Sequence, residues 1–353
     1  MKMTKLLTMA FAATLLFNVS CRNEDPIVEE SAKGAYENGV IISNEGVISI
    51  PNSSVSFISN DLSFQENTIF AKNNNNAELG NIFQSIGFKG DDAYLVLNVP
   101  NKVEIVNRYT FKKSGTLTAN LDNPRYIAFG SNNMTYITNN NFYNVRKLNV
   151  YDSGNTLVKS IDFDRYAEKV VSAGNYIYVQ TDGSKFDTNW NELPTGHTIT
   201  RINTATNEVD KTITLTDTAI IRDVISDNST VYVLSSDNTE SFLYRINGST
   251  GSFDKLALSG ISHAEKLAIE NNQLYFLSGN KVYSLATTAT SAPTSELFSV
   301  TGSYIYGFNV INGYFYVSDA SFTEDSTVRI YNNTGSLQKT IKTGIGTNGF
   351  YKN

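Results

Sequence analysis

One short pattern recurs along this chain and constrains its fold more than any other feature. An apolar residue is followed by a turn rich in Gly, Asn or Asp, and a Tyr lies eight residues after the apolar position within an alternating run. The copies are residues 86–94, 170–178, 224–232, 267–275 and 308–316, and a sixth copy, 127–136, has one additional turn residue. The six tyrosines lie 42, 42, 54, 43 and 41 residues apart. This period is typical of propeller blades, each with four antiparallel strands.

Each copy continues into further strand-like segments that alternate apolar and polar residues. Residues 102–107 (KVEIVN) are a predicted third strand, and residues 210–215 (DKTITL) are a predicted fourth strand. The connecting turns, such as NGSTG at 247–251, supply the Asn and Gly that tight hairpins favour. With 12% aromatic residues and only 6 prolines, the composition suits a packed all-β fold, and no amphipathic helix is predicted after residue 40.

The two ends of the repeat region each contain part of a further blade. Residues 38–46 (NGVIISNEG) resemble the second strand of a blade with no first strand before it, and residues 347–353 (TNGFYKN) form a strand with no unit after it. Placing both in one sheet gives a seventh blade. The sequence therefore predicts an all-β, seven-bladed β-propeller over residues 38–353, with four-stranded antiparallel blades and a ring closed by the N- and C-terminal strands. Such closure leaves no open sheet edges.

Residues 1–20 have the features of a secretory signal peptide. Two lysines precede an apolar stretch of 12 residues at 6–17, which is too short for a membrane-spanning helix of about 20 residues. The only cysteine, Cys21, follows directly, and this arrangement resembles the bacterial lipobox, in which the signal is cut before a cysteine that then receives diacylglycerol. Val19 and Ser20 suit that pattern, whereas Asn18 stands where Leu is usual. The alternative is that cleavage occurs elsewhere and Cys21 is incidental.

Residues 21–37 are predicted to hold the lipidated cysteine and a flexible, acidic tether. The stretch contains five acidic residues and few apolar ones. Acidic residues soon after the lipidated cysteine resemble the signal that directs lipoproteins of Bacteroidetes to the outer face of the outer membrane; a charged linker of another purpose is the alternative. The net charge of −6 leaves no basic surface for a phosphate backbone, so no nucleic-acid partner is expected.

Propeller geometry predicts which residues surround the mouth of the central channel. The links that enter each innermost strand and the loops between second and third strands share one face, so the residues just before each aligned apolar position belong to it. In the six copies, the residues two positions before the apolar residue are Gln84, Arg125, Glu168, Arg222, Glu265 and Tyr306. The residues one position before it are Ser85, Tyr126, Lys169, Asp223, Lys266 and Gly307. Charged residues at so many equivalent positions, in a chain with only 18% charged residues, predict a polar rim that binds a ligand. The alternative is a set of charges that pair with one another and with water.

One repeat is longer than the others, and its extra length lies in the loop 181–197 on the same predicted face. This loop contains the only tryptophan, Trp190, together with Phe186 and His197. A Trp on a long loop either covers exposed core or contacts a partner, and the neighbouring rim favours binding. The next loop is expected to extend this surface with Asn140, Phe142 and Tyr143. The predicted ligand-binding residues are Gln84, Arg125, Tyr126, Glu168, Lys169, Trp190, Arg222, Asp223, Glu265 and Tyr306.

The sequence lacks motifs for catalysis and for metal or cofactor binding. The chain has two histidines, one cysteine and no G-x-S-x-G motif, so a histidine-rich metal site or a nucleophile elbow cannot be assembled. Residues 344–349 (GIGTNG) match G-x-G-x-x-G, but the few residues that follow leave no room for the helix that a dinucleotide site needs. No enzyme activity, metal or cofactor is expected; an acid/base pair among Glu168, Asp223 and Glu265 is the enzymatic alternative.

Several segments together resemble one family. They are the lipoprotein start, ISNEG at 42–46, AELGN at 77–81, NKVEIVN at 101–107 and NPRYIAF at 123–129. These segments are similar to those of the YncE-like seven-bladed surface lipoproteins of Bacteroidetes, and the resemblance covers residues 38–353. One branch, the BtuG-like proteins, captures cobalamin and related corrinoids at the cell surface and sits over a TonB-dependent outer-membrane transporter. The shared motifs are structural, so they assign no corrinoid contact; Glu45, Arg125 and Tyr126 combine a family motif with the predicted mouth face.

These observations predict a lipid-anchored outer-membrane protein, exposed at the cell surface, that binds a ligand at the channel mouth. Corrinoid capture for a TonB-dependent transporter is the sharpest form of this hypothesis. The alternative is a non-catalytic interaction or accessory propeller of another nutrient-uptake or adhesion system, in which the fold supplies a rigid docking surface.

Overall fold

The computed structural model describes residues 32–181, 185–186, 188–189, 192–193 and 197–353. The chain divides into two units, Met1–Lys33 and Gly34–Asn353, and the second unit carries the fold. Cys21, the predicted signal peptide and most of the predicted tether lie outside the described residues, as does Trp190. Among the residues that are described, no helix has the length and apolar character needed to cross a membrane.

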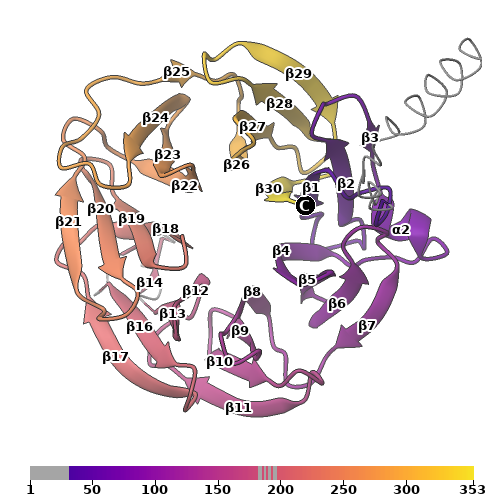
Figure 1. The fold of residues 1–353 in the computed structure, drawn as a ribbon, viewed down its shortest axis with the longest axis horizontal. Helices are drawn as coiled ribbons and strands as arrows, with labels where there is room; N and C mark the ends of the chain where they lie inside the picture. Colours follow the sequence, from indigo (N-terminus) through magenta and orange to yellow (C-terminus); the bar gives the residue numbers. More distant parts are fainter. Residues whose placement is uncertain (1–31, 182–184, 187, 190–191, 194–196) are drawn as a thin grey trace, which may run out of the picture. The chain divides into compact units, whose positions relative to one another are not determined.

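The second unit is a ring of seven sheets, each with four antiparallel strands (Figure 1). We number the blades along the chain and give their strands from the centre of the ring outward. The first blade contains β30 (Thr347–Lys352), β1 (Gly39–Asn44), β2 (Ser54–Ser59) and β3 (Gln65–Glu66). The second contains β4 (Ile82–Lys89), β5 (Asp92–Val99), β6 (Lys102–Asn107) and β7 (Lys113–Leu117). The third contains β8 (Pro124–Phe129), β9 (Thr135–Asn140), β10 (Arg146–Tyr151) and β11 (Leu157–Asp162).

The other four blades repeat this order. The fourth contains β12 (Val170–Ala173), β13 (Tyr176–Gln180), β16 (Thr198–Asn203) and β17 (Glu208–Thr214), with β14 (Lys185–Phe186) and β15 (Glu192–Leu193) in the long loop. The fifth contains β18 (Ile220–Ser226), β19 (Thr230–Ser236), β20 (Ser241–Asn247) and β21 (Phe253–Ala257). The sixth contains β22 (Ala264–Glu270), β23 (Gln273–Ser278), β24 (Lys281–Ala286) and β25 (Phe298–Ser299). The seventh contains β26 (Ile305–Ile311), β27 (Tyr314–Asp319), β28 (Thr327–Tyr331) and β29 (Leu337–Lys342). The predicted seven-bladed, all-β architecture is confirmed.

Each sheet buries its faces against its two neighbours, and the core is therefore divided among the blade interfaces. Seven clusters of buried apolar side chains fill the seven interfaces. The repeated tyrosines belong to them: Tyr136 and Tyr178 are fully buried. The Tyr178 hydroxyl donates to the backbone oxygen of Gly248 in the next blade at 3.0 Å. The repeat thus supplies both apolar contact and a polar link between successive blades.

The ring closes where the two ends of the repeat region meet. Strand β30 pairs with β1 from Val40↔Lys352 to Asn44↔Thr347. Phe350 on β30 is 2% exposed and packs with Val40, Ile42 and residues of β26 to β29. The predicted closure by terminal strands is confirmed, and residues 344–349 form the expected turn and the start of β30.

Two details differ from the sequence analysis. Residues 67–81, between β3 and β4, contain a short helix, α2 (Ile69–Asn73), which the sequence analysis did not predict. Its buried residues are Ile69 and Phe70, and one turn is too short to show helical periodicity. The packed part of the chain also begins before residue 38, because Tyr36 is 2% exposed and lies 5.2 Å from the Phe57 ring, centroid to centroid.

Closure of the ring can be tested at Phe350. We expect Phe350→Ala to lower the free energy of unfolding by about 3 to 5 kcal/mol, because the substitution leaves a cavity in the interface that joins the two ends of the chain. Leu337→Ala is the matched control, since Leu337 is 52% exposed on β29, the outermost strand of the seventh blade, and we expect a change within about 0.5 kcal/mol. Urea denaturation followed by circular dichroism measures both.

Removal of the last strand tests the blade register directly. Deleting residues 347–353 takes away β30 and exposes the edge of β1, so we expect a lower melting temperature than that of the full chain. An unchanged melting temperature would show that the assignment of the first blade is incorrect.

Candidate functional site

The candidate site lies on the face that carries the links into each innermost strand and the loops between second and third strands; we call it the entry face. On this face the pairing of the innermost strands is interrupted. Register shifts fall at Phe83/Ser85, Pro124/Ile127, Ile221/Asp223, Glu265/Ala268 and Ile305/Phe308, and at the β1–β30 pair. Such bulges redirect side chains away from the sheet. The predicted rim residues Gln84, Arg125, Tyr126, Arg222 and Tyr306 fall in these interruptions.

The first group of rim residues is centred on Arg125. Its Nε lies 3.0 Å from Glu168 Oε2, and its NH1 donates to Gln84 Oε1 at 2.7 Å. Asn140, at the end of β9, also donates to Glu168. Burial alone disfavours the charged guanidinium, but the neighbouring Glu168 carboxylate outweighs it and raises the pKa of Arg125. Three of the predicted residues, from three successive blades, are therefore joined in one network.

The second group is centred on Lys169. Its Nζ lies 3.0 Å from Asp223 Oδ1 and 4.5 Å from the centroid of the Tyr126 ring. The other Asp223 oxygen accepts a hydrogen bond from the backbone N–H of Leu267 at 3.0 Å. Burial acts to lower the pKa of Lys169, and the Asp223 charge overcomes it and raises the pKa. This ion pair connects the third, fourth, fifth and sixth blades.

The third group contains Tyr306, Glu45 and Lys266. The Tyr306 hydroxyl donates to Glu45 Oε2 at 2.6 Å, and Lys266 Nζ lies 5.1 Å from the centroid of the Tyr306 ring. Lys266 has a positive φ of 59°, which is unusual for a residue with a side chain. No described carboxylate lies within salt-bridge distance of its ammonium group, and burial lowers its pKa. Burial likewise raises the pKa of Glu45, against the hydrogen bond from Tyr306 and the charges of Arg125 and Lys266.

These electrostatic couplings bring the three groups together. Glu45 interacts with Arg125 and Lys266, and Lys266 also interacts with Asp223 and Lys169. We call the assembled set the mouth cluster: Glu45, Arg125, Tyr126, Glu168, Lys169, Asp223, Lys266 and Tyr306. It contains three acids and three bases and is contributed by six blades. Its charges are balanced, so it is suited to a ligand with polar groups of both kinds.

The remaining predicted residues are placed less centrally. The Arg222 Nε donates to Ser236 Oγ at 3.3 Å, toward the end of β19. Glu265 acts on Lys266 through its charge. Trp190 lies outside the described residues, so its position stays a prediction. Its loop connects β13 to β16, the second and third strands of the fourth blade, as the sequence analysis expected.

The neighbouring loop extends the rim as predicted. Phe142 is 42% exposed, and its ring centroid lies 5.2 Å from the Arg125 guanidinium carbon. Tyr143 is 79% exposed. Aromatic side chains therefore stand beside the Arg125–Glu168 pair on the entry face.

Sequence reasoning missed three features of the rim. Asn348 occupies the seventh equivalent position, two residues before Phe350, and its Nδ2 donates to the Phe83 backbone oxygen at 2.9 Å. Glu45 was noted only as part of a family motif. Tyr304 and Phe322 flank Tyr306, with Tyr304 stacked on it at 5.6 Å between ring centroids. Applying the same count to the last strand would have found Asn348.

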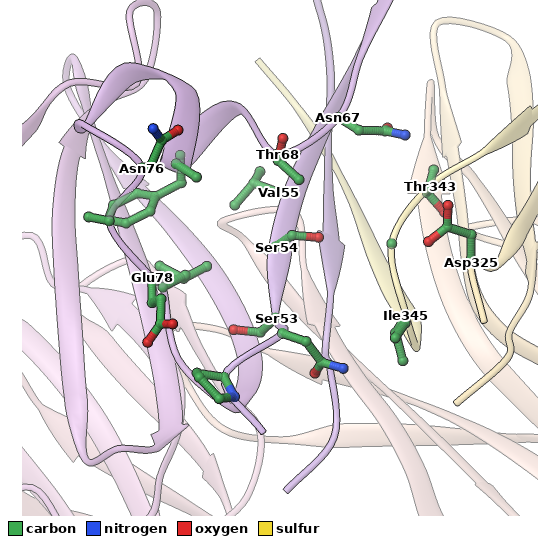
Figure 2. Close-up of a pocket in the computed structure, with 17 residues that line it drawn as sticks. Ser53, Ser54, Val55, Asn67, Thr68, Asn76, Glu78, Asp325, Thr343 and Ile345 are labelled. Carbon is green, nitrogen blue, oxygen red and sulfur yellow. The ribbon is translucent and has the colours of Figure 1, made fainter. Parts of the chain in front are cut away.

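A separate cavity of about 340 Å³ also opens on the entry face (Figure 2). It lies between the first and seventh blades and is formed by the β1–β2 loop, the β3–β4 link, the β27–β28 loop and the β29–β30 link. In Figure 2, Asn76 and Glu78 lie on one side of it, and Asp325 and Thr343 lie on the other. None of the residues of the mouth cluster lines this cavity.

The arrangement offers binding groups in both places. Within the described part of the chain, no three His, Cys, Asp or Glu side chains gather closely enough to hold a metal ion. The mouth cluster presents charged groups and aromatic rings, and the cavity presents carboxylates, amides and hydroxyls.

Seven four-stranded blades around one axis define the molecule as a β-propeller with a cluster of charged side chains on its entry face. Comparison with protein families identifies its family: the chain belongs to the family described as "Domain of unknown function (DUF5074)", whose model matches residues 38–348. No curated protein matches the chain.

Solved structures share the fold at low sequence identity. A protein from Lactobacillus plantarum has a TM-score of 0.63 at 13% identity, with 89% of this chain and 98% of that chain covered. The dihydro-heme d1 dehydrogenase NirN, solved in complex with DHE, has a TM-score of 0.55 at 10% identity, covering 91% and 76%. BamB from Moraxella catarrhalis has a TM-score of 0.52 at 14% identity, covering 90% and 86%. These likenesses show the propeller fold alone.

The buried Glu45 carboxyl group makes the stability of the fold dependent on pH. Because its pKa is raised in the folded chain, the folded state binds this proton more tightly than the unfolded state does. Its contribution to stability is therefore largest below the unfolded pKa and declines as the pH rises through the folded pKa. We expect Glu45→Gln to remove this decline and to be more stable than the parent at neutral pH, while Tyr306 keeps an oxygen acceptor.

Urea denaturation between about pH 4 and about pH 8 measures this difference, which should grow with pH. Glu324→Gln is the control, because Glu324 is exposed on a loop of the same face. A Glu45→Gln difference that is constant over this range would contradict the assignment of the pKa shift to Glu45.

Proposed function

We propose that this protein is a surface lipoprotein that binds a ligand through the mouth cluster and the surrounding loops of the entry face. One observation carries this proposal: six blades direct charged and aromatic side chains to one place on one face, and in four of these blades the innermost strand is bulged there. Ligand sites in proteins commonly combine a few convergent polar groups with aromatic surface. In this proposal Cys21 carries the lipid anchor, and the protein is held at the outer membrane on the cell-surface side.

Not every charged residue of the mouth cluster is equally available to a ligand, because some of them pair with one another. Arg125 pairs with Glu168 and Lys169 pairs with Asp223, and such pairing also suits a purely structural role for these four residues. Lys266 differs, because its ammonium group is held by a ring contact and not by a described carboxylate. Tyr304 and Phe322, which are 52% and 40% exposed, contact the Tyr306 ring that Lys266 also contacts. In this proposal Lys266 and these neighbouring aromatic rings face the ligand.

The sharper form of the proposal is corrinoid capture for a TonB-dependent outer-membrane transporter. The resemblance to the YncE-like surface lipoproteins supports it. A corrinoid presents a broad ring face and peripheral amides, which aromatic rings and charged side chains are suited to contact. The proposed role is non-catalytic and requires no cofactor.

Calorimetric titration with cobalamin and with cobinamide tests corrinoid binding. We expect a one-to-one complex, weakened at least about tenfold by Arg125→Ala or Trp190→Ala. Because Arg125 also holds Gln84 and Glu168, Phe142→Ala is a second variant that removes an exposed ring beside Arg125 and leaves the ion pair intact. Leu337→Ala, on an outer strand, should bind like the parent.

The outcomes separate the hypotheses. No heat and no spectral change with either corrinoid would eliminate corrinoid capture. Undiminished binding by all three mouth variants would place the site elsewhere. Turnover of a substrate that is lost in Glu168→Gln or Glu265→Gln would instead indicate an enzyme.

A second candidate function is docking onto a partner protein. The exposed apolar side chains on loops of the entry face favour it: Ile48 is 72%, Ile50 51% and Tyr143 79% exposed. Apolar side chains that gather on one face commonly mark an interaction surface. Such a module should retain a transporter in a pull-down without any small molecule, and Ile48→Asp with Ile50→Asp should abolish this retention.

A further inference from the structure

Lys266 is the one base of the mouth cluster whose ammonium group has no acid paired with it in the described part of the chain. The other two bases form ion pairs, each at 3.0 Å from a carboxylate oxygen. No described residue accepts a hydrogen bond from Lys266 Nζ, which lies over the Tyr306 ring at 5.1 Å from its centroid. This nitrogen is not one of the buried polar atoms that lack a partner, so it is open to solvent. An ammonium group has three N–H donors, and those of Lys266 are available to a ligand.

The acids around Lys266 do not fill this role. Three of them, Glu45, Asp223 and Glu265, act on the ammonium group through their charges, but none of these described side chains lies within salt-bridge distance of it. Asp223 is already in an ion pair. Glu45 accepts the Tyr306 hydroxyl at 2.6 Å, and burial raises its pKa, so it carries a negative charge less readily than an exposed glutamate does.

Exposed aromatic rings stand beside this ammonium group. Tyr304 is stacked on Tyr306, with 5.6 Å between the ring centroids and 21° between the ring planes. Phe322 meets both rings at steep angles, with its centroid 6.2 Å from that of Tyr304 and 5.6 Å from that of Tyr306. Tyr304 and Phe322 are exposed, so a ligand can contact them. Because Tyr306 contacts both the ammonium group and the two exposed rings, the cation and the aromatic surface lie in one place.

The exposed rings are held by the loops that carry them. The Tyr304 backbone N–H donates to Asp319 Oδ1 at 3.0 Å, and the Tyr304 backbone oxygen accepts from the Ala320 N–H at 2.9 Å. The Phe322 ring lies against Gly346, where an added Cβ would come 2.9 Å from Phe322 Cε1. The aromatic surface is thus formed before any ligand binds, and little conformational entropy would be lost on binding.

We call Lys266, Tyr304, Tyr306 and Phe322 the Lys266 subsite and propose that it binds an anionic group of the ligand. A carboxylate or phosphate oxygen accepts hydrogen bonds from Lys266, and a flat ring attached to it packs on Tyr304 and Phe322. Charge-assisted hydrogen bonds are stronger than neutral ones, and flat rings pack well on aromatic side chains. The mouth cluster is balanced in charge, so the preference for an anion comes from the available donors of one ammonium group. Anion binding here deepens the proposed function and rests on the mouth cluster being the ligand site.

Nuclear magnetic resonance titration of the full chain with phenylpropionate tests the proposal, with phenylpropionamide as the neutral probe of matched shape. We expect phenylpropionate to shift the backbone amides of the Lys266 subsite. It should bind at least about tenfold more tightly than phenylpropionamide, because the amide cannot form the charge-assisted hydrogen bond. Propionate, which has no ring, should also bind at least about tenfold more weakly. Phenylethyl phosphate distinguishes the two sources of the anion, since tighter binding than that of phenylpropionate assigns the subsite to a phosphate.

Substitutions separate the contribution of the charge from that of the rings. Lys266→Met should weaken phenylpropionate binding to the level of phenylpropionamide and leave phenylpropionamide within about twofold of its affinity for the parent. Tyr304→Ala should weaken both probes at least about threefold, because it removes an exposed ring. Lys255→Met is the matched control and should bind like the parent. Lys255 also lies over an aromatic ring, at 4.2 Å from the Phe242 centroid, but on β21, the outermost strand of the fifth blade.

Equal affinities for the acid and the amide, unchanged binding in Lys266→Met, or no shifts at the Lys266 subsite would overturn the proposal. The comparison of acid with amide uses the parent chain, so it decides the matter even where Lys266→Met fails to fold. The corrinoid titration tests the proposed function separately. Corrinoid binding without a preference for the acid would refute only the anionic subsite, and acid binding at Lys266 without corrinoid binding would refute only corrinoid capture.

Discussion

The pairing of β30 with β1 is the interaction on which the rest of the structure depends. A blade buries its faces only against its neighbours, so an unclosed row would leave the first and last blades with one apolar face in water. Strand β30 belongs to the first blade by hydrogen bonding and follows the seventh blade in the chain. Through Phe350 it also fills the interface between them. Closure therefore fixes the number of blades and the common axis toward which all seven innermost strands face.

The axis in turn determines what the entry face can do. Each innermost strand reaches this face next to its two neighbours, and bulges such as those of the sixth and seventh blades turn side chains away from the blade interfaces. Side chains at this face then meet side chains from other blades, as Lys169 meets Asp223 and Tyr306 meets Glu45. Each contributing blade supplies only one or two side chains, and the closed ring brings them together in the mouth cluster. The strained backbone at Lys266 is consistent with such a role, because a positive φ is retained only where the surrounding structure holds it.

The sequence predicted the fold well because a propeller repeats one local pattern. The alternation and the period placed residues such as Arg125 and Glu168 at equivalent positions, and the structure joins them. The repeat pattern did not identify Asn348, because the first blade is split between the two ends of the chain. Its innermost strand, β30, is the last strand of the chain, so the second strand that completes the pattern in the other blades does not follow it. The cavity could not be predicted, because Ser54, Glu78 and Asp325 lie far apart in sequence and only the closed ring brings them together. The approach of Tyr304 to Tyr306 depends on side-chain packing, which carries no periodic signal.

The mouth cluster and the cavity on the entry face are built from different kinds of side chains. The mouth cluster contains three acids and three bases, so a ligand gains little from net charge and must instead offer polar groups in a complementary arrangement. The cost of removing water from the Arg125–Glu168 and Lys169–Asp223 pairs makes that match demanding. The cavity is different: its lining contains only two charged residues, Glu78 and Asp325, among amides and hydroxyls from loops of the first and seventh blades. One closed ring thus places two separate groups of polar side chains on the same face, because different loops build them.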